Sequence, residues 1–432
     1  MDVDQVGSSA SAPAASEAAG EVEYAPDGSV VPRPRRQRLG VALCLSGGGF
    51  RAAMFHLGAM RRLNELGVLA RVTTISSVSG GSILAGLLAK EIGADWPSNG
   101  QFADWARVEE RMRAFCCKNI RTMPILVGAL PWNLLNSAKP VQELIDRYRE
   151  DLNSGLLRDL PRVGPKYIFC ATDMSYGVNW IFSAERIGSY QAGYLYNPDA
   201  RFDVATAVGA SSCFPPVFDP WPITVRPGEL SDGDDRSDER AERVRGLRLA
   251  DGGLYDNLGL EPVWRTHEYV LVSDGGSTFD AQGDGGLFWR LNRYVGVMGK
   301  QVGSLRKRWL IASFEDPDPD RALFGTYWGI GTFTRSYARR GETPVRGYGD
   351  DLVDEYISEV RTDLDRFSES EMDALINHGY LLAEAATARY TPDLRDDAPP
   401  PLRVPYEALM EPEALMRELR NSHKRKLPFG RR

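Results

Sequence analysis

The sequence predicts a three-layer α/β fold, in which helices cover both faces of a mostly parallel central sheet. Two observations lead to this prediction. Short apolar runs alternate with helical patterns from residue 39 onward, and the runs end in glycine-rich turns. Strands and helices that alternate in this way build parallel sheets through right-handed crossovers. The composition agrees, because 43% hydrophobic and 26% charged residues are ordinary values for a globular protein.

The first four elements define the alternation. The apolar run GVALCL at 40–45 predicts a strand buried on both faces, and SGGG then leads into a helical pattern over 50–66. The run VTTISSV at 72–78 is rich in β-branched residues and predicts a second strand. SGGS follows and opens the apolar helix ILAGLLAKEI. The order is strand, glycine loop, helix, strand, sharp turn, helix.

The later elements are more widely spaced. Helices are predicted over 104–119, 140–151 and 202–218, the last one stopped by Pro215, and strands over 166–174, 179–184, 247–253 and 269–276. The apolar segment 121–138 contains proline and glycine and is predicted to be a core loop or a flap over an apolar pocket. Ser368 and Glu371 have the spacing of a capping box at the head of one more helix.

These patterns predict four segments. Residues 1–38 are rich in Ala, Ser, Pro and Gly and are expected to form a disordered tail. Residues 39–280 form the expected catalytic domain, with a charged, exposed insertion loop at 227–246. Residues 281–400 are expected to be a helical extension packed on that domain, and residues 401–432 a basic tail.

Charge and targeting patterns argue against three classes of protein: nucleic-acid-binding, secreted and membrane-spanning. A net charge of −7 argues against a nucleic-acid-binding protein. The N-terminus lacks the basic and apolar regions of a classical signal peptide, and no apolar stretch is long enough for a transmembrane helix. Five cysteines without a C-x-x-C pair indicate reduced thiols. We expect a cytoplasmic protein whose membrane contact, if it has one, is peripheral.

Ser79 is the strongest candidate for a nucleophile. It lies in Ser77-Val78-Ser79-Gly80-Gly81, between a β-branched strand and an apolar helix. A nucleophile elbow has this setting and the form G-x-S-x-G, because the sharp turn admits only small neighbours. Here serine replaces the first glycine, which keeps the position small. The alternative interpretation is a tight turn in which Ser79 only caps the helix.

Gly47, Gly48 and Gly49 follow the first strand and predict an anion-binding loop. Consecutive glycines let backbone N–H groups converge on an anion. The loop lacks the lysine of a phosphate-binding loop and the spacing of a dinucleotide fingerprint. An oxyanion hole built from this loop and the Gly80 N–H fits the neighbouring elbow. The alternative is a packing turn.

The expected base for Ser79 is Asp251. This residue ends a predicted strand and is followed by Gly252 and Gly253. A carboxylate in a partly apolar site has a raised pKa and is able to take a proton from serine. The four histidines lie outside recognisable motifs; His56, inside the first helix, is expected to be structural, although His378 would keep the Ser-Asp-His chain order of a hydrolase triad.

The sequence resembles the patatin-like phospholipases. The resemblance rests on the glycine loop at 47–52, the elbow at Ser79, the Asp-Gly-Gly motif at Asp251 and the stretch GASSCFPPVF at 209–218. It covers roughly residues 41–277. Two positions depart from the family pattern, Ala52 at the end of the loop and Ser77 in the elbow. The resemblance implies a patatin-like fold and a Ser-Asp dyad that needs no histidine, metal or cofactor.

On this basis the sequence predicts a lipid acyl hydrolase that cleaves glycerophospholipid esters with Ser79 and Asp251, alone or after an unknown activator binds. The alternatives are a catalytically idle lipid-binding protein and an esterase for short soluble esters. Asp274 is the second choice of base, whereas Asp284, in another Asp-Gly-Gly string, is expected to be inert. Arg51 matches the family's basic loop position, where it would either steady the loop or attract a lipid phosphate.

Overall fold

The computed structural model describes residues 38–122, 124, 138–215, 217–276, 287–318 and 321–424, with two short strands at Glu23–Tyr24 (β1) and Val30–Val31 (β2). Three sequence predictions therefore lie wholly or mainly outside the described residues: the disordered tail at 1–38, the core loop or flap at 121–138 and the inert role of Asp284. The same holds for the basic end of the chain after residue 424.

A ten-stranded sheet forms the middle layer, with the path β12-β11-β3-β4-β5-β6-β7-β8 and with β10 and β9 branching from β5. The strands are β3 (Val41–Leu45), β4 (Val72–Val78), β5 (Lys166–Asp173), β6 (Val178–Phe182), β7 (Arg186–Ser189), β8 (Gly193–Tyr196), β9 (Trp221–Pro222), β10 (Arg248–Asp251), β11 (Tyr269–Asp274) and β12 (Phe324–Gly329). All pairings from β12 to β5 are parallel, whereas β6, β7 and β8 continue as an antiparallel meander.

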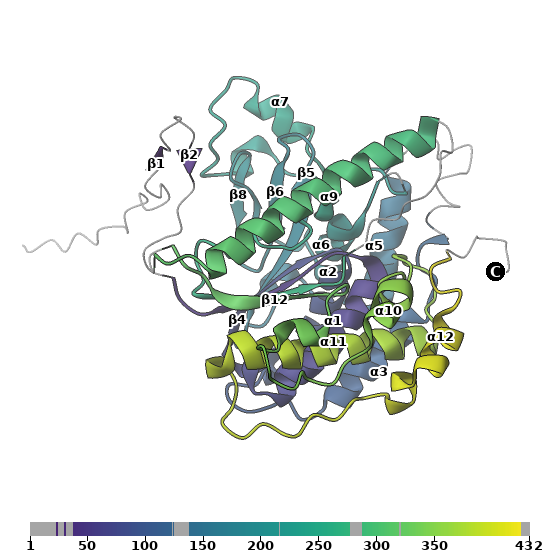
Figure 1. The fold of residues 1–432 in the computed structure, drawn as a ribbon. Helices are drawn as coiled ribbons and strands as arrows, with labels where there is room; N and C mark the ends of the chain where they lie inside the picture. Colours follow the sequence, from purple (N-terminus) through teal and green to yellow (C-terminus); the bar gives the residue numbers. More distant parts are fainter. Residues whose placement is uncertain are drawn as a thin grey trace, which may run out of the picture.

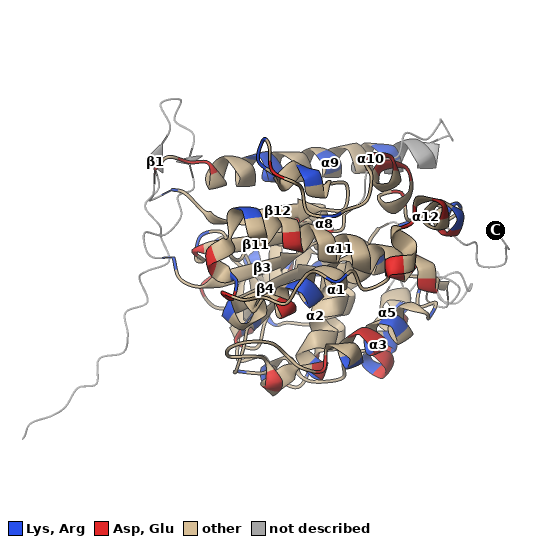
Figure 2. Cartoon of the chain, turned by 60° about the horizontal axis from the view of Figure 1, so that its bottom comes forward, with Lys and Arg blue, Asp and Glu red and all other residues tan. Residues whose placement is uncertain are grey.

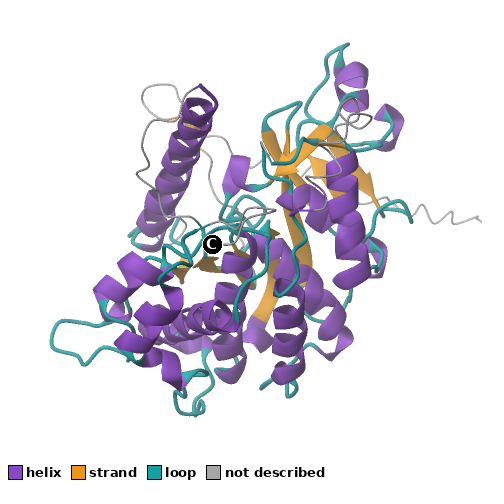
Figure 3. Ribbon diagram, turned by 90° about the vertical axis from the view of Figure 1, so that its right-hand side faces the viewer, coloured by secondary structure: helices purple, strands orange, loops and turns teal. Residues whose placement is uncertain are grey.

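Helices cover both faces of this sheet, which confirms the predicted three-layer α/β fold (Figures 1 and 3). The helices are α1 (Gly49–Glu65), α2 (Gly80–Glu91), α3 (Trp105–Cys116), α5 (Lys139–Asp151), α6 (Val204–Ser212), α7 (Arg240–Arg245), α8 (Gly253–Asp256), α9 (Leu287–Phe314), α10 (Asp350–Leu352), α11 (Glu369–Tyr390) and α12 (Pro412–Leu419). Strand β3 shows the layering, because Leu43 packs into the core with α1 and α11 while Cys44 packs into a second cluster with Leu310 of α9.

Helices α1 and α11 cross at two glycines. A Cβ on Gly58 would lie 2.0 Å from the Ile376 carbonyl oxygen, and a Cβ on Gly379 would lie 2.0 Å from that of Phe55. The two backbones are therefore in direct contact, which only glycine permits. Because α1 begins at the glycine loop, this crossing holds the loop against the C-terminal part of the chain.

The C-terminal part differs from the predicted helical extension. Strand β12 joins the central sheet in parallel with β11, and α11 belongs to the main core. Residues 401–424 are not a tail either, since α12 buries Leu415 and Leu419 and the Arg361 N–H donates to the Ser422 carbonyl at 2.9 Å. No strand was predicted at 324–329, although this aromatic run ends in a glycine turn at Gly329; its parallel pairing with β11 places it in the sheet.

Two smaller differences concern local boundaries. The charged segment 227–246, expected to be an exposed loop, contains α7 and buries Leu230, Asp235 and Val244. Helix α6 ends at Ser212, before the predicted stop at Pro215. All five cysteines are free thiols, and none of the helices in the described part of the chain is long and apolar enough to cross a membrane.

Candidate active site

Strand β5 brings the two expected catalytic residues together. Its first half pairs in parallel with β4, up to Val78 opposite Cys170. Its second half pairs antiparallel with β10, whose last residue, Asp251, lies opposite Ala171. Because β6 occupies the other edge of β5, β4 and β10 share one edge and run toward each other. Their C-terminal ends meet, so Ser79, the residue after Val78, reaches Asp251.

Ser79 has the strained backbone of a nucleophile elbow. Its φ of 51° and ψ of −114° lie outside the usual regions for a residue with a side chain. A Cβ on Gly80 would lie 2.1 Å from the Gly49 carbonyl oxygen, and a Cβ on Gly81 2.3 Å from that of Leu45. These close approaches explain why both residues after Ser79 are glycines. They also press the first turn of α2 against the glycine loop.

Three buried serines, Ser77, Ser82 and Ser211, form a hydrogen-bond network next to the elbow. The Ser79 N–H donates to the Ser211 hydroxyl at 2.9 Å, and the Ser211 hydroxyl donates to the Cys170 carbonyl at 2.6 Å. The Ser82 hydroxyl lies 2.9 Å from that of Ser211 and 3.0 Å from that of Ser77. These hydrogen bonds stabilise the strained turn at Ser79.

Asp251 is buried next to the Ser79 hydroxyl. Its Oδ1 accepts a hydrogen bond from the Gly253 N–H at 2.8 Å. Burial raises the pKa of the Asp251 carboxyl to about 6, and the hydrogen bonds from Gly253 and the Ser79 side chain only partly offset that rise. A carboxylate with such a pKa is ionised at pH 7 and is a stronger base than an exposed aspartate.

The glycine loop presents open amides beside Ser79. A Cβ on Gly47 would lie 3.1 Å from the Cβ of Ser79, so the loop adjoins the expected nucleophile. The amides of Gly48, Gly49 and Gly80 donate no hydrogen bond within the described part of the chain. Gly49 and Gly80 are the first residues of α1 and α2, where backbone N–H groups have no acceptor within the helix. Gly47 was also expected to be an oxyanion donor, but its N–H already donates to the Asn257 carbonyl at 3.1 Å.

The turn after Asp251 requires its glycines. A Cβ on Gly252 would lie 2.4 Å from the Cys170 carbonyl oxygen, and a Cβ on Gly253 2.6 Å from Oδ1 of Asn257. The Asn257 side chain thus lies between Gly253 and Gly47, where sequence reasoning had assigned it no role. Ser211 was missed in the same way. Their only sequence signal was membership of the two stretches that flank the Asp-Gly-Gly motif.

Comparison with known proteins decides the family. The sequence model of a family described as patatin-like phospholipase matches residues 43–264, slightly more than half of the chain. The chain belongs to the patatin-like phospholipase family. No curated protein matches the chain.

Solved structures that resemble this patatin-like protein are distant. A human GIVD cytosolic phospholipase A2 has 13% identity and a TM-score of 0.45, and the match covers 80% of this chain and 59% of that one. VipD from Legionella pneumophila has 14% identity and a TM-score of 0.32, with 85% and 70% covered. A SpcU–ExoU complex from Pseudomonas aeruginosa has 17% identity and a TM-score of 0.25, with 67% and 59% covered. The chain spans about three fifths of the human enzyme's length.

Both departures from the family motif have a structural context. The Ser77 hydroxyl donates to the Ile168 carbonyl at 3.1 Å, so the residue that replaces glycine is used in the serine network. Ala52 is fully buried in α1, and a Cβ on Gly275 would lie 2.8 Å from its methyl group. The methyl group at position 52 fits because residue 275 lacks a side chain.

Arg51 is buried under the loop instead of facing a substrate. Its Nε and one terminal nitrogen donate to the Gly275 carbonyl at 3.2 and 3.1 Å. Its other terminal nitrogen donates to the Ser358 and Val360 carbonyls at 3.0 and 2.9 Å. Burial lowers the pKa of the guanidinium to about 10. This arrangement favours the alternative in which Arg51 steadies the loop.

The other candidate bases, Asp274, His56 and His378, form hydrogen bonds or ion pairs with groups other than Ser79. Asp274 pairs with Lys307 at 2.6 Å; burial alone would raise its pKa, but this pair and the Tyr327 hydroxyl outweigh burial and lower it. His56 donates from Nε2 to the Ser46 carbonyl at 3.0 Å and accepts from Ser273, and His378 donates to the Ile330 carbonyl at 2.8 Å. Burial lowers the pKa of both histidines to about 4.

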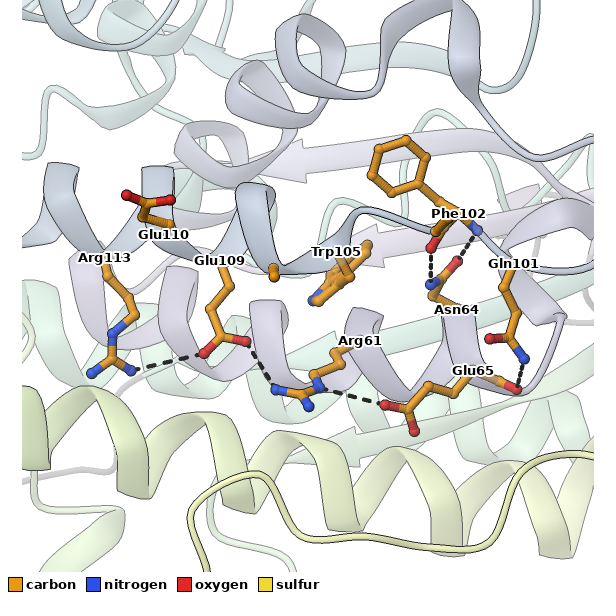
Figure 4. Close-up of a pocket in the computed structure, with 11 residues that line it drawn as sticks. Arg61, Asn64, Glu65, Gln101, Phe102, Trp105, Glu109, Glu110 and Arg113 are labelled. Carbon is orange, nitrogen blue, oxygen red and sulfur yellow. Dashed lines mark hydrogen bonds and ion pairs between the residues drawn. The ribbon is translucent and has the colours of Figure 1, made fainter.

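A separate cavity of about 500 Å³ lies between α1 and α3 (Figure 4). Within it Arg61 pairs with Glu65 at 3.4 Å and with Glu109 at 3.1 Å. Its lining residues come from 61–65 and 101–113, not from the segments that carry Ser79 and Asp251. No group of three potential metal ligands occurs among the described residues.

Proposed function

We propose that this patatin-like protein is a lipid acyl hydrolase of the phospholipase A type, acting on fatty-acyl esters of glycerophospholipids through Ser79 and Asp251. The main support is the junction of β4 and β10, which puts the Ser79 hydroxyl against a buried carboxylate of raised pKa. Family membership supports the lipid ester as substrate.

The proposed mechanism has two halves. Asp251 takes the Ser79 proton as Oγ attacks the ester carbonyl, and the open amides of Gly48, Gly49 and Gly80 bind the oxyanion. Asp251 then returns the proton to the leaving lysophospholipid oxygen, which leaves an acyl-serine. In the second half Asp251 deprotonates water and the hydroxide attacks the acyl carbon. Asp251 then returns this proton to the departing Ser79 oxygen, so that fatty acid and free Ser79 result.

Fatty-acid release from mixed phospholipid micelles tests this proposal. Ser79→Ala is expected to lower kcat by about 10³-fold or more, because it removes the nucleophile. Asp251→Asn is expected to lower it by about 10²- to 10⁴-fold, because an amide accepts no proton. Asp274→Asn is the matched control, an equally conservative change at the end of β11, and is expected to retain most of the activity.

Other outcomes identify the alternatives. Loss of activity in Asp274→Asn but not in Asp251→Asn would reassign the base. A silent wild type that still reacts with a fluorophosphonate at Ser79 would have a competent site that waits for an activator. Silence in both assays would favour an idle lipid-binding protein. A series of acyl-chain lengths with highest activity on short soluble esters would favour an esterase.

A further inference from the structure

Helix α9 exposes an apolar stripe on its outer face. Tyr294, Met298, Val302, Leu305 and Trp309 recur at spacings of three and four residues, which places them on one side of the helix. Their exposed fractions run from 39% to 60%. A contiguous exposed patch of this kind marks an interaction site more often than scattered apolar residues do. We call these five residues the α9 stripe.

All charged residues of α9 are basic. Residues 287–314 contain six Lys or Arg and no Asp or Glu, in a chain whose net charge is −7. In Figure 2 the positions of Lys and Arg along α9 are blue. Arg308 is exposed one turn from Leu305, and the exposed Arg265 stacks on Trp264, whose ring contacts that of Trp309 with centroids 4.8 Å apart. Basic groups therefore border the stripe.

The inner face of α9 is bound to the two loops beside the candidate site. Lys307 pairs with Asp274, which is followed by the Gly275 turn that contacts the glycine loop. Arg306 donates to the Tyr255 carbonyl at 3.3 Å and to Glu261 at 3.1 Å, in the segment that follows Asp251. A surface that binds the α9 stripe is thus brought to the same side of the molecule as these loops.

We propose that the α9 stripe docks on the surface of an anionic phospholipid bilayer. A helix with an apolar face, a basic polar face and an aromatic residue at its edge lies in the interface of such a membrane. Anionic headgroups attract the basic groups while the apolar side chains enter the acyl boundary. Self-association through the stripe would bring the exposed Arg308 and Arg265 of two copies together at its border, which like charges oppose.

This inference rests on the proposed function, because it names the surface on which the enzyme meets its substrate. A binding assay without turnover separates the two. Protein is sedimented with vesicles of ether-linked phosphatidylcholine, with or without about a quarter of ether-linked phosphatidylglycerol. An ester hydrolase does not cleave these lipids. Leu305→Glu is compared with Val163→Glu, since both side chains are 59% exposed. Unfolding midpoints check that both variants fold.

The wild type is expected to bind only the anionic vesicles and to be released by high salt. Leu305→Glu is expected to bind at least about tenfold more weakly, because a carboxylate enters the apolar boundary and faces anionic lipid. Val163→Glu is expected to bind like the wild type. Equal binding by Leu305→Glu and the wild type would overturn the proposal, as would no binding by the wild type.

Two further readouts complete the design. A wild-type dimer that Leu305→Glu converts to a monomer, seen by light scattering, would make the stripe a self-association surface and overturn membrane docking. The ratio of hydrolysis on anionic vesicles to hydrolysis of a soluble ester is expected to fall about tenfold in Leu305→Glu. If vesicle binding holds and the wild type cleaves no ester, the proposed function fails while the docking proposal stands.

Discussion

Ser79 and Asp251 are each held in an unfavourable state, one in backbone conformation and the other in solvation. Ser79 has a positive φ although it carries a side chain, and Asp251 is a carboxylate removed from water. Such costs gather where chemistry requires them. The hydrogen bonds of Ser211 and Gly253 keep both residues in place.

Under the proposed mechanism, the raised pKa of Asp251 determines how activity depends on pH. A base must be ionised in the free enzyme, so log kcat/KM is expected to rise with unit slope as pH increases toward about 6 and to level off above it. Activity at pH 5 is then about one tenth of the plateau. The measurement is a pH profile of kcat/KM on a soluble ester.

Asp173 supplies the control, because burial also raises its pKa to about 6. Asp173→Asn is expected to keep the same inflection, since its carboxylate accepts from Ser175, Tyr176 and Ser189 and not from Ser79. A plateau that extended unchanged to about pH 4.5 would contradict Asp251 as a buried base.

At the scale of elements, the crossing of α1 and α11 carries the glycine loop. Gly58→Ala is expected to destabilise the protein by about 1–3 kcal/mol, because the new methyl group forces the Ile376 carbonyl away. This outweighs the gain in helix propensity of about 1 kcal/mol. The midpoint and slope of urea unfolding measure the change.

Gly299→Ala in α9 makes the same substitution where a Cβ meets nothing within 4 Å. It is expected to leave stability unchanged or raise it by up to about 1 kcal/mol, since only helix propensity changes there. Equal effects of the two substitutions would mean that the helix crossing is loose and that propensity alone decides both.

At the scale of the whole molecule, the central sheet is completed by the C-terminal part of the chain. The family match ends at residue 264, but β11 and β12 lie beyond it and α11 covers α1. A chain that ends after Gly276 would expose the β11 edge and the buried face of α1. It is expected to lack a cooperative thermal transition and to aggregate.

A chain that ends after Lys424 keeps every C-terminal element that the structure describes. It is expected to elute as a folded species and to melt near the full-length temperature. Circular dichroism melts and size-exclusion chromatography compare the two. Cooperative melting of the shorter chain would show that residues 39–276 fold without β12 and α11.

The sequence alone was sufficient for features that depend on local chemistry. The strands at 41–45 and 72–78 and the helices after them follow from short apolar runs and glycine turns. The family resemblance, carried by the motifs around Ser79 and Asp251, was confirmed. Such features require only neighbours in the chain, because strand propensity, turn geometry and elbow spacing are local.

The tertiary structure alone decided the features that depend on long-range pairing. These are the end-to-end meeting of β4 and β10, the use of the Gly47 amide by Asn257, the burial of Arg51 against carbonyls from 275 and 358–360, and the place of β12 in the sheet. Partners so distant in the chain leave no periodic or spacing signal. Their contacts exist only once the sheet has fixed which strand ends adjoin.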